Sequence, residues 1–202
     1  MKRVSIKKRY HHGDLRHAAL AIALDILDAE GPQNLNLRAV AERAGVTPMA
    51  LYRHFDDKAA LMGAIAEHGF GLLRQRLGEA TVAGPAEHRL AAWGVAYVLF
   101  ARDHPHVYRL MYDGPPTWQD AAERAALPER PETVLGMMTA FLRAEFKAEE
   151  VDLALLTAWS FVHGLASLVI DRRITPFPPD VEALAAAAGA LFAARLLAPA
   201  ST

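Results

Sequence analysis

The chain has 202 residues, 52% of them hydrophobic, and its 22 Lys and Arg residues nearly balance its 23 Asp and Glu residues. This length suits one domain or two small ones with a substantial core. The lack of Cys excludes disulfides, thiolate metal sites and cysteine nucleophiles, and it fits a reducing compartment. No apolar run follows the charged N-terminus, so we expect no signal peptide and a cytoplasmic protein.

The basic residues gather at one end of the sequence. Residues 1–17 hold six basic residues and one acid. We expect residues 1–13 to form a basic arm in which Lys7, Lys8 and Arg9 contact a polyanion. A solvated tail without a partner explains the same composition equally well.

Helical periodicity of the apolar residues runs through nearly the whole chain, and β-type alternation is almost absent. The sequence therefore predicts an all-α fold of about nine helices. The expected helices cover residues 14–30, 37–44, 48–54, 57–77 (with Asp56 as its cap), 85–103, 149–171 and 179–197, with a short helix around 107–111 and another beginning at Pro131.

Residues 36–58 have the pattern of a helix-turn-helix. Asn36 is expected to cap the first helix, and Ala41 is small where the second helix crosses it. Gly45 stands at the turn, where a positive φ is easiest. With a start at Thr47 and Pro48, the second helix points its first turn outward, as a recognition helix must to reach base edges. An ordinary two-helix corner shares part of this pattern.

The same segment resembles the DNA-binding domain of the TetR family of bacterial transcriptional regulators. The family's turn is Ala-Gly-Val-Thr at 44–47, followed by Leu-Tyr-Arg-His-Phe at 51–55 and by Lys58. The resemblance covers residues 10–70. It implies a sequence-specific DNA-binding regulator that is not an enzyme, by family default a repressor released by a small-molecule effector.

Two further stretches are typical of a TetR subgroup named for a Trp–His–Gly motif in its C-terminal domain. They are Arg-Tyr-His-His-Gly-Asp-Leu-Arg at 9–16 and Ala-Trp-Ser-Phe-Val-His-Gly-Leu at 158–165. Together with a small, aperiodic stretch from Gly78 to Pro85, this predicts a DNA-binding domain at 14–60 and an effector-binding and dimerisation domain at 78–202. The fourth helix, to about residue 77, would connect them.

The resemblance gives contacts with the DNA backbone to Tyr52, His54 and Lys58, all of which can donate to phosphate. Thr47 can donate through its hydroxyl or its helix-start amide. Arg38 is a candidate for either a base edge or a phosphate. For Tyr52, an ordinary packing role with the hydroxyl at the surface is the alternative.

Pro48, Met49 and Arg53 are less typical of the family, so we expect sequence preference to reside there. Arg53 can pair with guanine through two hydrogen bonds, whereas Met49 offers apolar contact, for instance with a thymine methyl. A solvated charge is an equally good interpretation of Arg53.

The last two expected helices are the predicted homodimer interface on a palindromic operator. Residues 153–170 carry no charge, and residues 183–194 are rich in Ala, which permits close helix approach. TetR-like proteins dimerise through these helices in a four-helix bundle. Two internal core helices would show the same composition.

The middle helices are expected to enclose an effector pocket whose lining is apolar apart from a few polar side-chain groups. Plain core packing explains any one of its candidates, and a satisfied buried imidazole explains His163. The candidate lining residues are Trp93, Tyr97, Tyr108, Met111, Trp118, Met137, Phe141, Trp159 and His163.

Competing classes have little support in the sequence. The His pairs at 11–12 and at 104 and 106 have no nearby carboxylate cluster, and motifs for di-iron, zinc and serine hydrolase chemistry are missing. We therefore expect no metal, no cofactor and no membrane association. A helical small-molecule carrier stays open as the alternative, and it would bind ligand without salt-sensitive DNA binding.

Overall fold

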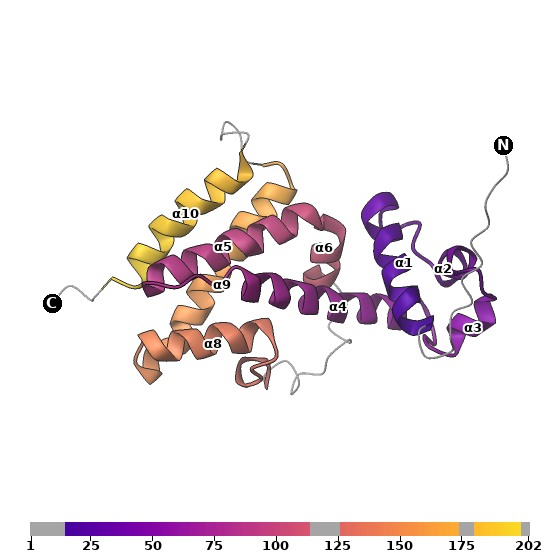
Figure 1. The fold of residues 1–202 in the computed structure, drawn as a ribbon, viewed down its shortest axis with the longest axis horizontal. Helices are drawn as coiled ribbons and strands as arrows, with labels where there is room; N and C mark the ends of the chain where they lie inside the picture. The colour runs from indigo at the N-terminus through magenta and orange to yellow at the C-terminus, as the bar shows by residue number, and fades with distance from the viewer. Residues whose placement is uncertain (1–14, 114–125, 174–179, 199–202) are drawn as a thin grey trace.

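The computed structural model describes residues 15–113, 126–173 and 180–198, which contain nine α-helices and no strand. The all-α fold predicted from the sequence is confirmed. The helices, labelled as in Figure 1, are α1 Leu15–Glu30, α2 Leu37–Ala44, α3 Pro48–Tyr52, α4 Lys58–Glu79, α5 Ala86–Asp103, α6 Pro105–Asp113, α8 Val134–Glu145, α9 Val151–Ile170 and α10 Val181–Leu196, with short 3₁₀ turns at Leu127–Glu129 and Ala148–Glu150.

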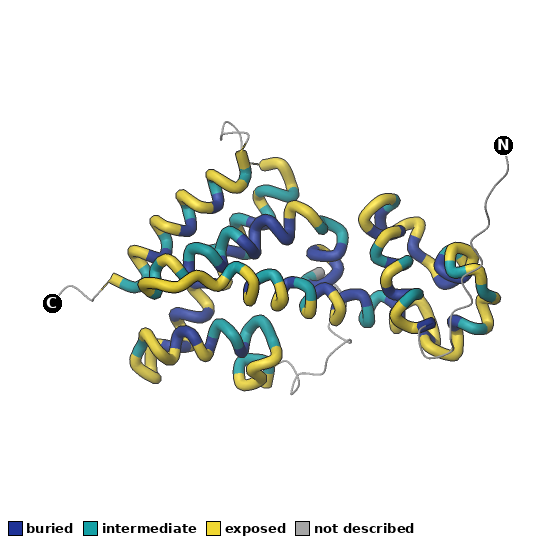
Figure 2. The backbone as a smooth tube through the Cα atoms, viewed as in Figure 1, coloured by how far each residue is buried: buried dark blue, intermediate teal, exposed yellow. Residues whose placement is uncertain are grey.

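The molecule is elongated, with a small helical bundle at one end and a larger one at the other (Figure 1). Helices α1 to α3 form the small bundle, and α4 extends from it into the larger bundle of α5, α6, α8, α9 and α10. Buried segments run through the middle of both bundles and along one side of α4 (Figure 2). The long helix α4 is therefore shared by the two bundles.

The turn between α2 and α3 follows the predicted chemistry. The Asn36 side chain accepts a hydrogen bond from the Ala39 amide at 2.9 Å and caps α2. Gly45 ends α2 with a φ of 68°, in the left-handed region that favours glycine. Ala41 and Leu51 are completely buried where α2 and α3 meet. These local signals fix the angle between the two helices.

Several helix boundaries differ from the prediction by one to three residues, and those at α3, α4 and α8 have local causes. Asp57, not Asp56, caps α4, because its backbone is the last extended one and its carboxylate accepts from the Ala60 amide at 2.8 Å. Helix α3 ends at Tyr52 rather than at 54, and the amides of His54 and Phe55 then both bond to the Leu51 carbonyl. Helix α8 begins at Val134 rather than Pro131, because the cap is Thr133.

Helix α5 is the centre of the larger bundle and packs against α4, α6, α9 and α10. Helix α10 approaches it closely at Gly189, where an added Cβ would lie 3.4 Å from the Ala91 carbonyl oxygen. Eight residues of α5 are buried, and they lie on several sides of the helix: Leu90, Trp93, Ala96, Tyr97, Val98, Leu99, Phe100 and Ala101. This helix supplies one wall of a cavity, through Leu90, Trp93, Gly94 and Tyr97.

Helix α9 differs from an internal core helix, the alternative for residues 153–170, because little of it is buried within the chain. The segment Ala148–Ile170 is long and apolar enough to cross a membrane. An 18-residue window within it has a mean hydropathy of 1.8, yet only 17% of that window is buried. Large apolar side chains on α9 and α10 face outward: Leu153, Leu156, Trp159, Leu168 and Leu191.

Candidate nucleic-acid interface and ligand cavity

Helix α3 presents one face to the solvent and the other to the small bundle. Leu51 is fully buried, whereas Met49 and Tyr52 are 67% and 44% exposed. Thr47 and Pro48, at the start of the helix, are also exposed. Because five residues make only about one turn and a half, the buried Leu51 and the half-buried Ala50 anchor the helix and leave Pro48, Met49 and Tyr52 exposed.

The charged candidates surround this helix. Arg38, Arg53, His54 and Lys58 are all exposed. The Lys58 ammonium lies 3.4 Å from the Pro32 carbonyl oxygen, which positions it at the start of α4. The structure thus places these four side chains at the surface of the α2–α4 region, while Lys7, Lys8 and Arg9 lie outside the described residues.

Contacts from α1 hold the end of α3 in place. The guanidinium of Arg16 lies 5.7 Å from the centroid of the Phe55 ring, a cation–π geometry. The Phe55 side chain itself is buried, at 2% exposure. Arg43, in the last turn of α2, forms an ion pair with Glu30 at the end of α1. The outward face of α3 therefore rests on a rigid support.

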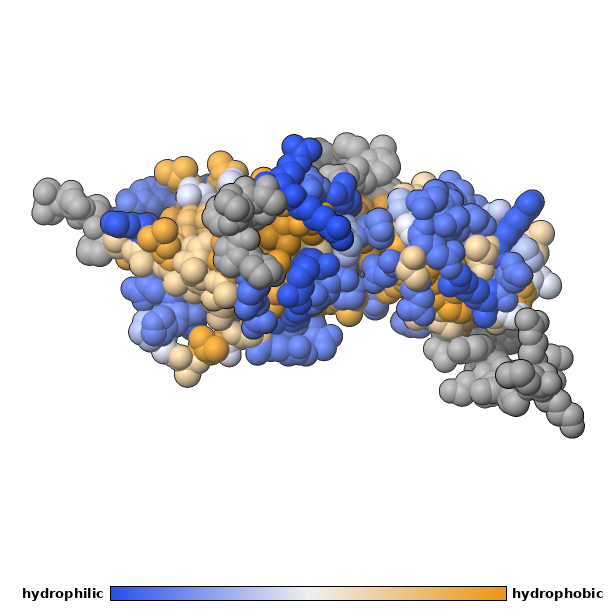
Figure 3. Space-filling view, turned by 90° about the horizontal axis from the view of Figure 1, so that it is seen from above, coloured by the Kyte–Doolittle hydropathy of each residue, from blue (hydrophilic) through white to orange (hydrophobic). Residues whose placement is uncertain are grey.

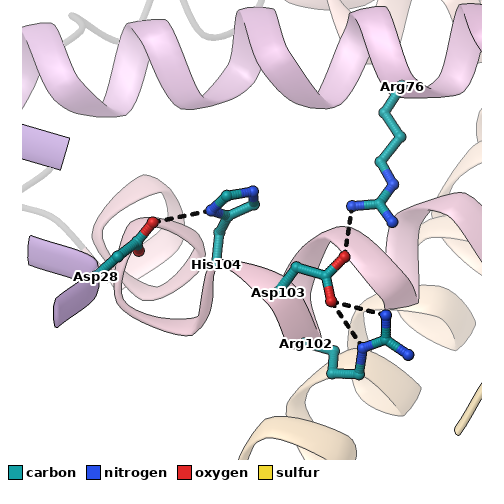
Figure 4. Close-up of polar contacts among 5 residues, drawn as sticks. All are labelled: Asp28, Arg76, Arg102, Asp103 and His104. Atoms are coloured by element: carbon teal, nitrogen blue, oxygen red, sulfur yellow. Dashed lines mark hydrogen bonds and ion pairs between the residues drawn. The ribbon is translucent and has the colours of Figure 1, made fainter. Parts of the chain in front are cut away.

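Polar contacts join the small bundle to the large one (Figure 4). The His104 ring nitrogen Nδ1, between α5 and α6, lies 2.9 Å from the Asp28 carboxylate of α1. Asp103 accepts from Arg76 of α4 at 2.9 Å and also pairs with its neighbour Arg102. Partial burial would raise the pKa of Asp103, but hydrogen bonds from Arg102 and Arg76 outweigh it and hold this pKa below its usual value.

Helices α4 and α6 touch most closely at Gly69. A Cβ added there would lie 2.7 Å from Met111 Sδ and 2.8 Å from Val107 Cγ1. Packing therefore favours glycine at this position, although its backbone is helical. Met111, one of the predicted pocket residues, packs in this contact between α4 and α6.

An apolar cavity lies among α4, α5, α8, α9 and α10, and the centres of water-sized spheres can occupy about 40 Å³ of it. Trp93, Tyr97 and Trp159 line it, as do Leu135, Met138 and Phe192. The Trp93 indole N–H donates to the Thr81 hydroxyl at 3.0 Å, so this polar group is satisfied by the protein. None of the described residues that line the cavity is charged.

A cluster of polar aromatic side chains from α5, α6 and α9 adjoins the cavity. The Tyr97 hydroxyl donates to the Tyr112 hydroxyl at 2.8 Å and lies 3.3 Å from that of Tyr108. The Tyr108 hydroxyl lies 2.6 Å from His163 Nδ1. Burial, reinforced by the two neighbouring tyrosines, raises the pKa of Tyr97 far above its ordinary value, and burial raises the pKa of Tyr112 to about 12.

The nine predicted pocket residues thus fall into different surroundings. Tyr108 and His163 belong to the polar cluster rather than to the cavity wall, and Phe141 packs against Trp93 with ring centroids 5.4 Å apart. Met137 is half-buried beside the core, and Trp118 lies outside the described residues. A ligand-binding role stays a prediction for all nine.

Several residues of the cavity and cluster were absent from the sequence prediction. Tyr112 lies four residues after Tyr108 on α6, so the helical spacing would have placed both on one face. Gly94 also lines the cavity, and nothing lies within 4 Å of the position that its Cβ would occupy. A glycine in a helix gives no sequence signal of the space beside it.

A helix-turn-helix with an outward second helix, attached to a larger helical domain that contains a cavity, defines the class of helix-turn-helix regulators. Comparison with known families narrows this class. The model "Bacterial regulatory proteins, tetR family" matches residues 19–65, and the model "Tetracyclin repressor-like, C-terminal domain" matches residues 90–192, about half of the chain.

Individual relatives agree with these matches. The tetracycline repressor protein class C of Escherichia coli is 46% identical over 52 residues, 26% of this chain and 24% of the repressor. The match thus spans about a quarter of that relative's length. A Rhodococcus sp. RHA1 structure of unknown function is 31% identical, with a TM-score of 0.74 over 96% of this chain and 100% of the other.

A TetR variant from Acinetobacter baumannii, solved in complex with minocycline, shares the fold: its TM-score is 0.62 at 21% identity, over 90% of this chain and 97% of the other. The chain belongs to the TetR family of bacterial regulatory proteins, which are DNA-binding transcriptional regulators. Its place in the Trp–His–Gly subgroup stays a prediction.

Proposed function

We propose that this protein is a cytoplasmic repressor that binds palindromic operator DNA as a homodimer and is released by a small-molecule effector. The observation that supports it best is the exposed face of α3, with Met49 and Tyr52 directed outward from a buried Leu51. A helix with one anchored face and one exposed face can enter a major groove without unfolding its support.

In this proposal, different residues contact the DNA backbone and the DNA bases. Tyr52, His54 and Lys58 donate to phosphates, together with Thr47 at the start of α3. Arg53 and Met49 read base edges, and their side chains set the sequence preference. Arg38 reaches a base edge or a phosphate, and the basic arm with Lys7, Lys8 and Arg9 follows the DNA backbone.

The second copy of the chain covers the outward faces of α9 and α10. Leu153, Leu156 and Leu191 are 69%, 56% and 64% exposed, although both helices are mostly apolar. Seen from above in Figure 3, apolar surface gathers over the half of the molecule that carries the larger bundle, while the α1–α3 end is mostly hydrophilic. An uncovered apolar face of this kind is an association surface.

Effector binding in the cavity would act on the DNA-binding bundle through α4 and α6. These helices are in van der Waals contact at Gly69. At the junction shown in Figure 4, Arg76 of α4 contacts Asp103, and His104, which immediately precedes α6, contacts Asp28. The ligand needs only to favour a dimer whose two α3 helices no longer match successive major grooves.

Fluorescence anisotropy on DNA from immediately upstream of the protein's own gene tests this function. The comparison is a shuffled duplex of the same composition. Tight binding to the upstream duplex and weak binding to the shuffled one are the expected results, with affinity falling as salt is raised. Failure to bind either duplex at low salt would contradict the proposal and favour a helical carrier.

A further inference from the structure

The cavity has the chemistry of a site for uncharged molecules. Its walls are aliphatic, aromatic and glycine residues, and among the described residues no Lys, Arg, Asp, Glu or His lines it. A charged group buried there would lose its hydration without gaining a partner, a penalty that outweighs the gain from apolar contact. The lining thus selects against carboxylates and ammonium groups.

The walls also favour a ring system. Trp93 and Trp159 line the cavity from α5 and α9, and Phe192 completes it from α10. The ring of Phe192 stacks on that of Phe161, with centroids 4.1 Å apart and planes at 4°, which fixes its orientation. Gly94 leaves open space between these aromatic walls. Flat apolar ligands make dispersion contacts over both faces in such surroundings.

Tyr97 connects the apolar cavity to the cluster of polar aromatic side chains. Its side chain lines the cavity, and its hydroxyl belongs to the cluster with Tyr108, Tyr112 and His163. A phenol hydroxyl donates one hydrogen bond and accepts up to two. The contacts of 3.3 Å to Tyr108 and 3.4 Å to His163 are longer than the 2.8 Å contact to Tyr112, so they are the ones that a ligand oxygen or hydroxyl would replace.

We infer that the effector is an uncharged, lipophilic, ring-containing molecule with a single hydroxyl or carbonyl group, and that this group meets the Tyr97 hydroxyl. This inference rests on the proposed function, because it names the chemical class of the effector that releases the DNA. The apolar body supplies the affinity, and Tyr97 selects one polar group at one end.

Three probes with the same ring system separate these contributions. Isothermal titration calorimetry on the full-length protein, at neutral pH and without DNA, would compare 2-naphthol, naphthalene and 2-naphthoate. We expect 2-naphthol to bind about 3- to 10-fold more tightly than naphthalene. We expect 2-naphthoate to bind at least about tenfold more weakly than naphthalene. Binding of 2-naphthoate as tight as that of 2-naphthol would overturn the inference.

Two variants locate the binding. Gly94→Leu fills the open space of the cavity and should weaken all neutral probes by about tenfold or more, whereas Gly71→Leu adds the same side chain at an exposed position of α4 with nothing within 4 Å and should change nothing. Tyr97→Phe should remove the preference for 2-naphthol over naphthalene while naphthalene binding, which reports an intact fold, stays constant. Equal binding in Gly94→Leu and Gly71→Leu would place the probes elsewhere and contradict the inference.

The same measurements distinguish this inference from the proposed function. The three probes can bind with the expected order of affinities while 2-naphthol leaves operator binding unchanged. That result would support the ligand class inferred for the cavity and contradict release of the DNA by this ligand. If all probes bind alike, or none binds while the operator is bound tightly, the inference about the effector is wrong and the DNA-binding function stands.

Discussion

His104 Nδ1 lies 2.9 Å from the Asp28 carboxylate, and this contact joins the corner between α5 and α6 to the first helix of the DNA-binding bundle. The two side chains are 37% and 32% exposed. A displacement of α6 must therefore either break this contact or carry α1 with it. The pair is a mechanical connection between the cavity domain and the helices that support α3.

The contribution of this contact can be measured by charge reversal. Asp28→Lys should lower the free energy of unfolding by about 0.5–1 kcal/mol more than Asp25→Lys, because exposed pairs are worth no more than that. Asp25 is an exposed acid of the same helix for which the described residues show no ion pair. Urea unfolding measures both, and equal losses would show that the His104 contact is not formed in solution.

Packing between α4 and α6 predicts a large difference between two glycines two residues apart. Gly69→Ala places a Cβ within 2.8 Å of Met111 and Val107, so it should cost about 1–3 kcal/mol of unfolding free energy. Gly71→Ala meets nothing within 4 Å and should be neutral or stabilising by up to about 1 kcal/mol. Chemical denaturation would decide; a stabilised Gly69→Ala protein would contradict the packing.

The tyrosine cluster predicts a loss of stability at alkaline pH. In the unfolded chain Tyr97 and Tyr112 ionise near pH 10, at about the ordinary tyrosine pKa. In the folded protein burial keeps both protonated above that, with the pKa of Tyr112 raised to about 12. The unfolded state thus binds fewer protons above about pH 10, so the unfolding free energy falls as pH rises, by up to about 1.4 kcal/mol per pH unit for each tyrosine.

Urea midpoints between about pH 8 and pH 11.5 measure this decline. Below about pH 10 the two tyrosines should contribute no pH dependence, since both states keep their protons. The double variant Tyr97→Phe/Tyr112→Phe should lose most of the decline. A decline of the same steepness in the double variant would contradict the assignment to these tyrosines.

The dimer interface proposed on α9 and α10 predicts that a charge placed on this face changes the mass of the protein particle in solution. Leu156→Glu places a charge on the exposed apolar face of α9 and should convert a dimer to a monomer, because the charge would be buried without a partner. Val82→Glu is the matched control, an exposed apolar residue in the connection between α4 and α5. Sedimentation velocity would report both, and a Leu156→Glu protein that stays dimeric would exclude this face as the interface.

The DNA-binding bundle could be predicted from the sequence because its signals are local. Asn36 caps the helix that follows it, and Gly45 adopts the positive φ that its position requires. Adjacent aspartates misled the prediction at α4, since Asp56 and Asp57 have the same capping chemistry and only the backbone selects one of them.

The cavity could not be predicted in the same way, because its walls come from helices far apart in the sequence. Leu77 of α4 and Phe192 of α10 meet at one space, and no local pattern records that meeting. The uncovered face of α9 was hidden for a different reason. Residues 153–170 carry no Asp, Glu, Lys or Arg, and their polar residues Thr157, Ser160, His163 and Ser167 form only a short stripe beside large apolar side chains. This stripe only weakly marks the side that leaves the core.

DNA binding by α3 and its flanks is tested most directly by a salt titration of operator affinity in single variants. Lys58→Ala should weaken binding and lower the slope of log affinity against log salt by about 0.9 per protomer, since one phosphate neutralisation is lost. Tyr52→Phe should weaken binding without changing the slope, because a hydroxyl carries no charge.

The control is Lys147→Ala, an exposed lysine before the second 3₁₀ turn in the cavity domain, which should match the unmodified protein in both affinity and slope. Anisotropy at four or more salt concentrations gives each slope. A reduced slope is expected for Lys58→Ala alone. Identical affinities and slopes for Lys58→Ala, Tyr52→Phe and Lys147→Ala would contradict DNA binding through α3.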